Sequence, residues 1–234
     1  MKNIIQLAKY LSKSEKFPFY LSGGTALSYF YLKHRESADL DFWGKMPDFR
    51  GVLKIITELK EKKIFEIARS SENGNANVIV FNIDGIKVDF IEDIYNEIYR
   101  KNDIIEGIPV DSLYGIYYKK LQAISGIQTE DKAGKPVSAG HRINAKDIYD
   151  LYHLSKVEPL SEFISRVEKD DHPINEKLII QNIRRADYMT LFSEFDLIKQ
   201  LKKTDFREMK EYLIKETDII LEKGIEINDF QLGY

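Results

Sequence analysis

Two short motifs near the start of the chain have residue types suited to chemistry on a phosphate group. Gly23-Gly24-Thr25 comes first, and Asp39-Leu40-Asp41 follows at a distance that one helix can span. Asp39 and Asp41 are one residue apart, so on a β-strand their carboxylates project to the same face. Mg²⁺ usually binds one or two carboxylates together with substrate phosphates, and free N–H groups at a helix start can face an anion. The motifs predict chemistry on a nucleotide.

A third acidic residue, Asp89, lies on another predicted strand. Asp84-Gly85 is a strong hairpin signal, and it pairs the predicted strands 77–82 and 86–91. Alternation along the second strand puts Asp89 on one face with Lys87 and Ile91, opposite Ile86, Val88 and Phe90. We therefore expect Asp89 alongside Asp39 and Asp41. Taken alone, Asp89 is better interpreted as an edge-strand charge that limits aggregation.

Three acidic side chains so arranged suit phosphoryl or nucleotidyl transfer. In this interpretation Asp39 and Asp41 hold metal ions, and Asp89 shares one ion and orients or deprotonates the attacking hydroxyl. The alternative is a chance Asp-x-Asp, although carboxylates in an otherwise apolar strand are costly to bury without a cation. The glycines could also form a simple strand–helix turn, with Ser22 or Thr25 as the helix cap.

A second candidate set lies in the C-terminal half. Lys120 is beside the apolar stripe of a predicted helix, where it either extends to solvent or meets a triphosphate as a point charge. Asp147 and Asp150 are one turn apart and share a helix face. Asp147 could complement the helix dipole, and one of the two could pair with Lys120 or Arg142. An ordinary salt bridge and a nucleotide contact both remain open for this set.

Other charged residues have weaker interpretations. His34 is interpreted as structural, and Arg35 could screen the acidic cluster or pair with it. A basic stretch in the last helix region could contact RNA, but interspersed acidic residues favour a solvated surface; it comprises Lys199, Lys202, Lys203, Arg207 and Lys210.

Composition excludes several classes of protein. The chain has 234 residues, a net charge of −3 and no cysteine. Disulfides, Cys-ligated zinc and thiol catalysis are thereby excluded, and a reducing cytosol is consistent with this. We expect no signal peptide, no membrane span and a cytoplasmic protein. The modest net charge gives no global attraction to nucleic acid.

The coarse pattern predicts an α+β fold, a mixed sheet flanked by helices in residues 1–110 followed by a mainly helical domain in 111–234. Expected strands are 17–21, 38–43, 64–69, 77–82, 86–91 and 108–110. Residues 127–141 are polar and contain Gly and Pro, which predicts a mobile loop. Expected helices are 2–13, 25–33, 50–62, 111–126, 144–156, 159–168, 174–185, 190–201 and 204–223.

The motifs in their order resemble a known family. LSGGTALSYFYLKHRESADLDFW, IKVDFIED, KLQAISG and RINAKDIYDLYHL span about residues 18 to 156. This series resembles the AbiEii/AbiGii-type nucleotidyltransferases, bacterial toxin or abortive-infection proteins with a DNA polymerase β-like nucleotidyltransferase fold. The pattern GGTxL followed by HRxSxDLDF is a specific signature, and the later motifs add to it.

The resemblance implies roles for individual residues. Asp39, Asp41 and Asp89 would be the metal ligands, and Lys120 and Asp147 would join them as functionally required residues. Gly23, Gly24 and Thr25 would form the nucleotide-binding turn, with Lys120 and Asp150 in support.

The resemblance also implies an activity. The protein would transfer a nucleoside monophosphate from an NTP to an acceptor in a Mg²⁺-dependent reaction, and the expected acceptor is tRNA. A neighbouring antitoxin would oppose this toxin. Two further hypotheses remain: nucleotidylation of a partner protein, and a non-catalytic interaction module that keeps the fold. The clustered carboxylates argue against the last, because a binding module has no need of them.

Overall fold

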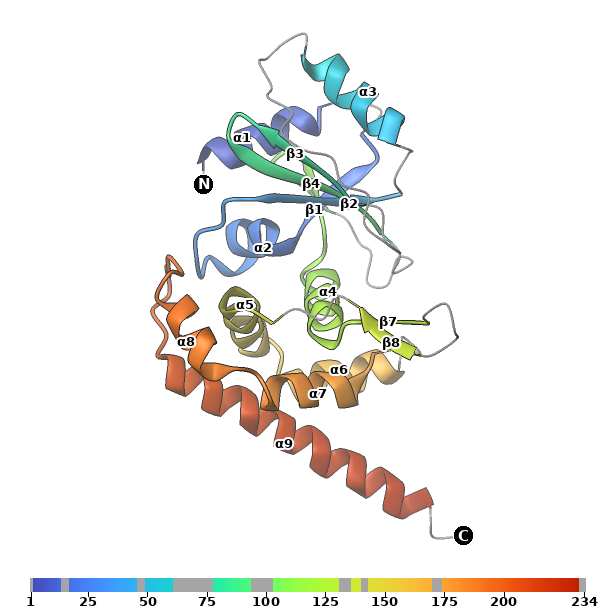
Figure 1. Ribbon diagram of the computed structural model, residues 1–234, viewed down its shortest axis with the longest axis vertical. Coiled ribbons are helices and arrows are strands. Elements are labelled where there is room, and N and C mark those ends of the chain that lie inside the picture. Colours follow the sequence, from blue (N-terminus) through green and yellow to red (C-terminus); the bar gives the residue numbers. More distant parts are fainter. Residues whose placement is uncertain are drawn as a thin grey trace. The chain divides into compact units, whose positions relative to one another are not determined.

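The computed structural model describes residues 2–13, 17–45, 49–60, 78–93, 103–130, 136–139, 143–169 and 174–231 (Figure 1). The chain divides into two compact units, Met1–Ile116 and Tyr117–Tyr234. Each unit has its own set of elements and its own buried residues. The division after residue 110 that the sequence suggested stays a prediction.

The first unit is built on a mixed six-stranded sheet with the order β3-β4-β2-β1-β6-β5. β1 pairs antiparallel with β2 and parallel with β6, whereas β2 pairs parallel with β4. Hairpins join β3 to β4 and β5 to β6. The strands are β1 (Phe19–Ser22), β2 (Leu40–Gly44), β3 (Val78–Ile83), β4 (Ile86–Glu92), β5 (Asp103–Ile105) and β6 (Ile108–Val110).

One face of the sheet is aromatic and fully buried. Phe42 of β2 and Phe90 of β4 are register partners, and their rings stack 5.7 Å apart. Phe19 and Phe81 pack edge-on against Phe90 at 5.0 and 5.8 Å. Since side chains alternate along a strand, the residues between these aromatics must face the other side of the sheet. The aromatic face therefore decides which residues β2 and β4 present opposite it.

Helices lie on both sides of this sheet. Figure 1 shows α2 on one side, with α1 and α3 on the other. α1 (Lys2–Leu11) and α3 (Phe49–Lys60) each bury apolar side chains at helical spacing: Ile5, Leu7, Ala8 and Leu11 in α1, and Val52 and Ile56 in α3. The segment predicted as one helix over 25–33 is a four-residue α-helix, α2 (Gly23–Ala26), continued as a π-helical segment, η1 (Leu27–Leu32). It ends at Lys33 with the backbone in the left-handed region.

Several sequence-based boundaries need correction in this unit. β2 starts at Leu40, so Asp39 precedes the strand that was expected to begin at residue 38. β5 was not predicted, although Glu106-Gly107 forms its turn to β6 with positive φ at both residues. The Asp84-Gly85 hairpin is confirmed. The predicted strand 64–69 lies outside the described residues.

The second unit is mainly helical. α4 (Leu113–Ser125) leads into it, and a small antiparallel hairpin of β7 (Ile127–Glu130) and β8 (Pro136–Ala139) follows. α9 packs against α5, α6 and α7, and α8 packs against α5. The remaining helices are α5 (Ala145–Ser155), α6 (Leu160–Lys169), α7 (Glu176–Arg184), α8 (Tyr188–Phe195) and α9 (Phe206–Gln231).

Aromatic stacking and a buried hydroxyl pair help to fix the interior of this unit. The rings of Tyr117 and Phe163 stack 3.9 Å apart, joining α4 to α6. The Tyr117 hydroxyl lies 3.0 Å from Ser155 Oγ at the end of α5. Burial raises the pKa of Tyr117 well above its usual range, so the phenol stays neutral and serves as a hydrogen-bonding group.

Two predictions in the second unit were wrong in detail. β7 and β8 occupy part of the segment 127–141 that was expected to be a loop, because strand pairing gives its backbone partners that polar composition does not reveal. α8 ends at Phe195, before the expected end at residue 201. Within the described part of the chain, no helix combines the length and hydrophobicity that crossing a bilayer requires.

Replacing Phe90 by Ala should strongly destabilise the first unit, because Phe90 contacts four other rings and is fully buried. We expect a loss of about 3–5 kcal/mol in the free energy of unfolding, measured by urea denaturation with circular dichroism. Ile104→Ala is the control, since this side chain is largely exposed and should change stability by under about 0.5 kcal/mol. An unchanged urea midpoint for F90A would contradict the assigned core.

Candidate active site

The sheet brings two of the three predicted carboxylates together. Asp41 of β2 and Asp89 of β4 are register partners on neighbouring parallel strands, on the face opposite Phe42 and Phe90. Asp89 is 8% exposed, and Asp41 is partly exposed. Asp39 is exposed just before β2. The side-by-side placement of Asp41 and Asp89 is the arrangement that the sequence predicted, whereas the position of Asp39 on the strand was wrong.

The glycine turn lies directly against Asp41. Gly23 has a φ of +68°, and a Cβ atom built on it would come 2.2 Å from Asp41 Oδ2. A Cβ on Gly24 would come 2.4 Å from a terminal nitrogen of Arg35. Position 23 therefore requires glycine for its backbone conformation and for its closeness to Asp41, whereas a side chain at position 24 would require the Arg35 guanidinium to shift. The turn forms a close backbone cradle between a carboxylate and a guanidinium.

Side-chain hydrogen bonds attach the segment before β2 to the helix that follows the turn. Thr25 Oγ1 donates to the Asp39 carbonyl, and Ser28 Oγ donates to the Arg35 carbonyl. The Arg35 guanidinium is buried and donates to the Glu36 carbonyl at 3.0 Å. His34 is fully buried, which fits its structural interpretation. These contacts fix the path of residues 34–39 around the turn.

Ser22 and Thr25 do not cap the helix as the sequence suggested. The Ser22 side chain makes no capping hydrogen bond and instead donates to Asp111 Oδ2 at 2.6 Å. Tyr31 also donates, to the Asp111 carbonyl at 2.6 Å. Burial and the charges of Asp111 and Asp103 raise the pKa of Tyr31 to about 12, so the phenol remains a donor. Asp111, which directly follows β6, thereby links the ends of β1 and η1.

Lys87 is the basic residue of this site that sequence reasoning did not assign. Its ammonium forms an ion pair with Asp89 Oδ2. Partial burial alone would lower the pKa of Lys87, but the hydrogen bond and charge of Asp89 and the charges of Asp41 and Asp39 raise it overall. The alternation of residues 86–91 already placed Lys87 and Asp89 on one face, and this was the available signal.

The residues present suit a hard divalent ion, although they do not yet form a closed cage. Among the described residues, no three His, Cys, Asp or Glu side chains are gathered closely enough to hold a metal. Asp41 and Asp89 do provide two adjacent carboxylates, and the bare backbone of Gly23 lies directly against Asp41. Mg²⁺ characteristically binds through one or two carboxylates completed by phosphates and water. The donor set fits such an ion.

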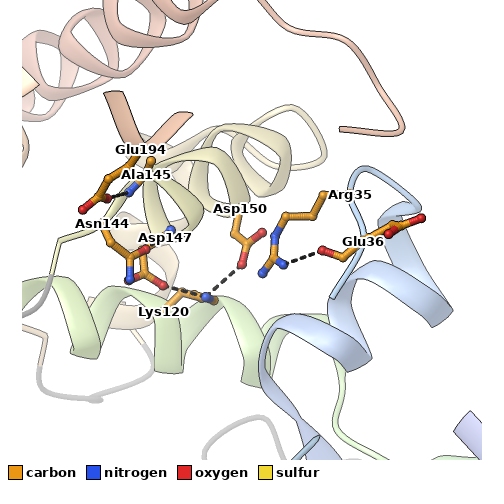
Figure 2. A network of polar contacts seen from close by, with 8 residues as sticks. All are labelled: Arg35, Glu36, Lys120, Asn144, Ala145, Asp147, Asp150 and Glu194. Atoms are coloured by element: carbon orange, nitrogen blue, oxygen red, sulfur yellow. Dashed lines mark hydrogen bonds and ion pairs between the residues drawn. The ribbon is translucent and has the colours of Figure 1, made fainter. Parts of the chain in front are cut away.

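The second unit has its own charged cluster, shown in Figure 2. Lys120 Nζ lies 2.8 Å from both Asp147 Oδ1 and Asp150 Oδ2. The side chain of Asp150 is fully buried, and those of Lys120 and Asp147 are 13% and 11% exposed. The predicted pairing of Lys120 is thus confirmed, and it involves both aspartates. Such a cluster provides one ammonium held by two carboxylates.

The N-terminus of α5 positions the two aspartates of this cluster. Asn144 Oδ1 accepts a hydrogen bond from the Asp147 backbone N–H at 2.8 Å, as an N-cap does. Glu194 Oε2 accepts from the Ala145 N–H at 3.0 Å. Asp147 in the first turn complements the helix dipole, as predicted. Two side chains outside α5 therefore hold the start of the helix that carries Asp147 and Asp150.

The remaining predicted residues give no further site. Arg142 lies outside the described residues. Of the basic stretch in the last helix region, Arg207 pairs with Glu211 at 2.8 Å, and Lys210 lies 4.4 Å from the centre of the Tyr188 ring. These contacts agree with the solvated-surface interpretation.

Comparison with known proteins places this geometry in a family. Residues 7–223 match the family model described as "Nucleotidyl transferase AbiEii toxin, Type IV TA system". A crystal structure of a candidate nucleotidyltransferase from Helicobacter pylori superposes with a TM-score of 0.54 at 18% identity, covering 97% of this chain and 95% of that one. The structure of JHP933 from Helicobacter pylori gives 0.51 at 18% identity, covering 98% and 95%. No curated protein matches the chain.

Replacing Gly23 by Ala should damage the turn, because Ala is strained at a φ of +68° and its methyl would meet the Asp41 carboxylate. We expect a loss of about 1–3 kcal/mol in the free energy of unfolding, measured by urea denaturation. Gly85→Ala is the matched control: its φ is +77°, but no atom lies within 4 Å of the built Cβ. Equal losses of unfolding free energy in the two variants would show that the contact with Asp41 does not contribute to the cost of the Gly23 substitution.

Replacing Lys120 by Met should destabilise the second unit, because it leaves the buried carboxylate of Asp150 without its ammonium. The expected loss is about 3–5 kcal/mol, typical of removing one partner of a buried pair, measured by chemical denaturation. Lys119→Met, at the adjacent position of the same helix, is the control. A K120M protein as stable as K119M would contradict the structural importance of the cluster.

Proposed function

Because the chain belongs to the AbiEii family of nucleotidyl transferase toxins, we propose that it transfers a nucleoside monophosphate from an NTP to tRNA in a Mg²⁺-dependent reaction. Nucleotidyl transfer itself follows from family membership, as do an NTP substrate and an antitoxin partner. The proposal adds the acceptor, the metal and the residue roles. The observation that carries it is the adjacency of Asp41 and Asp89 beside the Gly23–Gly24 turn.

Asp41 and Asp89, with Asp39 at the start of β2, are the residues that would hold Mg²⁺. When bound, the ion would neutralise phosphate charge and align the attacking and leaving oxygens. The buried aromatic face behind β2 and β4 keeps the two strands in register, and so keeps the carboxylates a fixed distance apart. Such preorganisation avoids rearranging the ligands during the reaction.

In the first unit, the glycine turn would contact the triphosphate. In the second unit, the family resemblance assigns a nucleotide contact to Lys120. Gly23 and Gly24 present bare backbone to a phosphate, and Thr25 holds the turn against the Asp39 carbonyl. Lys120 would contribute a point charge, with Asp147 and Asp150 holding its ammonium in place.

In the chemical step, the acceptor hydroxyl oxygen attacks the α-phosphorus. The bond from that phosphorus to the oxygen bridging to the β-phosphate breaks, and pyrophosphate leaves with the bonding electrons. Asp89 orients the hydroxyl and accepts its proton. This role requires a carboxylate oxygen within hydrogen-bonding distance of the acceptor hydroxyl. The net result is one new phosphodiester bond on the acceptor.

The acceptor assignment rests on the family resemblance. A tRNA acceptor and an NTP donor together place the proposed reaction in the cytoplasm. Nucleotidylation of a protein would use the same donor site, so the geometry of Asp41 and Asp89 does not favour it over RNA.

Replacing Asp41 by Ala should lower the rate of nucleotide transfer by at least about a hundredfold. The effect should be this large because removing a residue that only supports a metal ligand already lowers activity by about tenfold to a hundredfold. The assay incubates the protein and each α-³²P-labelled NTP with Mg²⁺ and either total tRNA or lysate protein, and follows the label. Asp39→Ala should also abolish transfer. Asp84→Asn, in the exposed hairpin turn, is the matched control and should keep full activity.

The outcomes separate the hypotheses. Label in tRNA that is lost in D41A supports the proposal, whereas label retained in both D41A and D39A rejects the metal assignment. Label confined to the protein fraction would identify a protein nucleotidylating enzyme. No label in either fraction, with no NTP binding by calorimetry, would indicate a non-catalytic module.

A further inference from the structure

Lys87 lies on the solvent side of a buried carboxylate. It precedes Asp89 by two residues on β4, so both side chains project from the same face of the sheet. Its ammonium contacts Asp89 Oδ2, and the Lys87 side chain is 50% exposed whereas that of Asp89 is 11% exposed. The lysine therefore reaches over Asp89 from the direction in which solvent and dissolved ions approach.

The ammonium also balances the neighbouring carboxylate. Asp41 is the register partner of Asp89, so two negative charges stand side by side on adjacent strands, on the same face of the sheet. Like charges at such close range repel, more strongly where burial reduces solvent screening. The carboxylates of Asp89, Asp41 and Asp39 all stabilise the protonated form of Lys87. Lys87 thus contacts the Asp89 carboxylate directly and lies close enough to Asp41 and Asp39 to feel their charges.

We propose that Lys87 is the resident counter-ion of the Asp41–Asp89 pair, and that a divalent ion must displace its ammonium from Asp89. The proposal rests on the proposed function, because it takes Asp41 and Asp89 as metal ligands. It assigns to Lys87 a positioning role: holding the two like-charged carboxylates side by side before the metal and nucleotide arrive.

Displacement follows from the charge and shape of the lysine side chain. An ammonium and a divalent cation repel each other when both lie beside one carboxylate. Binding both at Asp89 therefore costs free energy. The flexible four-carbon stem and the 50% exposure let the ammonium move into water. Lys120 contrasts with it, because that lysine is 13% exposed and is held by two aspartates. Of the two lysines, Lys87 is the one able to exchange with a cation.

The test compares Mn²⁺ binding to the wild-type chain, Lys87→Gln and Lys87→Arg, without nucleotide. Free Mn²⁺ is measured by electron paramagnetic resonance during titration. We expect K87Q to bind Mn²⁺ about threefold to tenfold more tightly than wild type, because a competing partly exposed ion pair is gone. K87R keeps the charge and should bind close to wild type. In EDTA, K87Q should melt at a lower temperature than wild type, and K87R should restore much of the loss.

The results separate this proposal from the proposed function. Equal or weaker Mn²⁺ binding by K87Q, with clear binding by wild type, would overturn the counter-ion role and leave the metal site standing. A lower melting temperature without tighter binding would likewise overturn it, since a purely structural ion pair gives that result. No Mn²⁺ binding by wild type and K87Q would reject the metal assignment, and displacement with it.

Discussion

The parallel pairing of β2 with β4 is the constraint on which the site depends. One register places Phe42 beside Phe90 on the buried face and Asp41 beside Asp89 on the other. A slip of one residue would turn the carboxylates toward the aromatic core and the aromatics toward solvent. Both changes are costly, so burial of the rings selects the one register in which the carboxylates are adjacent. The hydrophobic core thereby positions the chemical groups.

In each unit a lysine pairs with aspartate carboxylates, but the two lysines differ in how exposed they are. In the sheet unit, Lys87 is half exposed and pairs with a carboxylate of the proposed metal site. In the helical unit, Lys120 is nearly buried between Asp147 and Asp150, whose helix start is held by Asn144 and Glu194. Exposure decides what each lysine can do: the first can exchange with an arriving cation, whereas the second is held in one place.

Much of this site could be predicted from the sequence because its signals are local. Period-2 alternation and the Asp84-Gly85 turn located Asp89 on the correct face, and helical spacing placed Asp147 and Asp150 together. The start of β2 and the roles of Ser22, Thr25 and Asp111 were missed. Those depend on which distant backbone or side chain supplies the hydrogen-bond partner, for example Asp111 for Ser22 across the sheet. The β7–β8 hairpin was missed for the same reason, because pairing outweighed polar composition.

The most direct test of the central claim is to locate a bound ion crystallographically. Crystals soaked with Mn²⁺ and a non-hydrolysable NTP analogue would be measured for anomalous scattering from the metal. Our account predicts a peak bridging the Asp41 and Asp89 carboxylates, within about 2.0–2.3 Å of an oxygen from each, with Lys87 turned away from Asp89. A bound analogue whose metal touches neither carboxylate would contradict it.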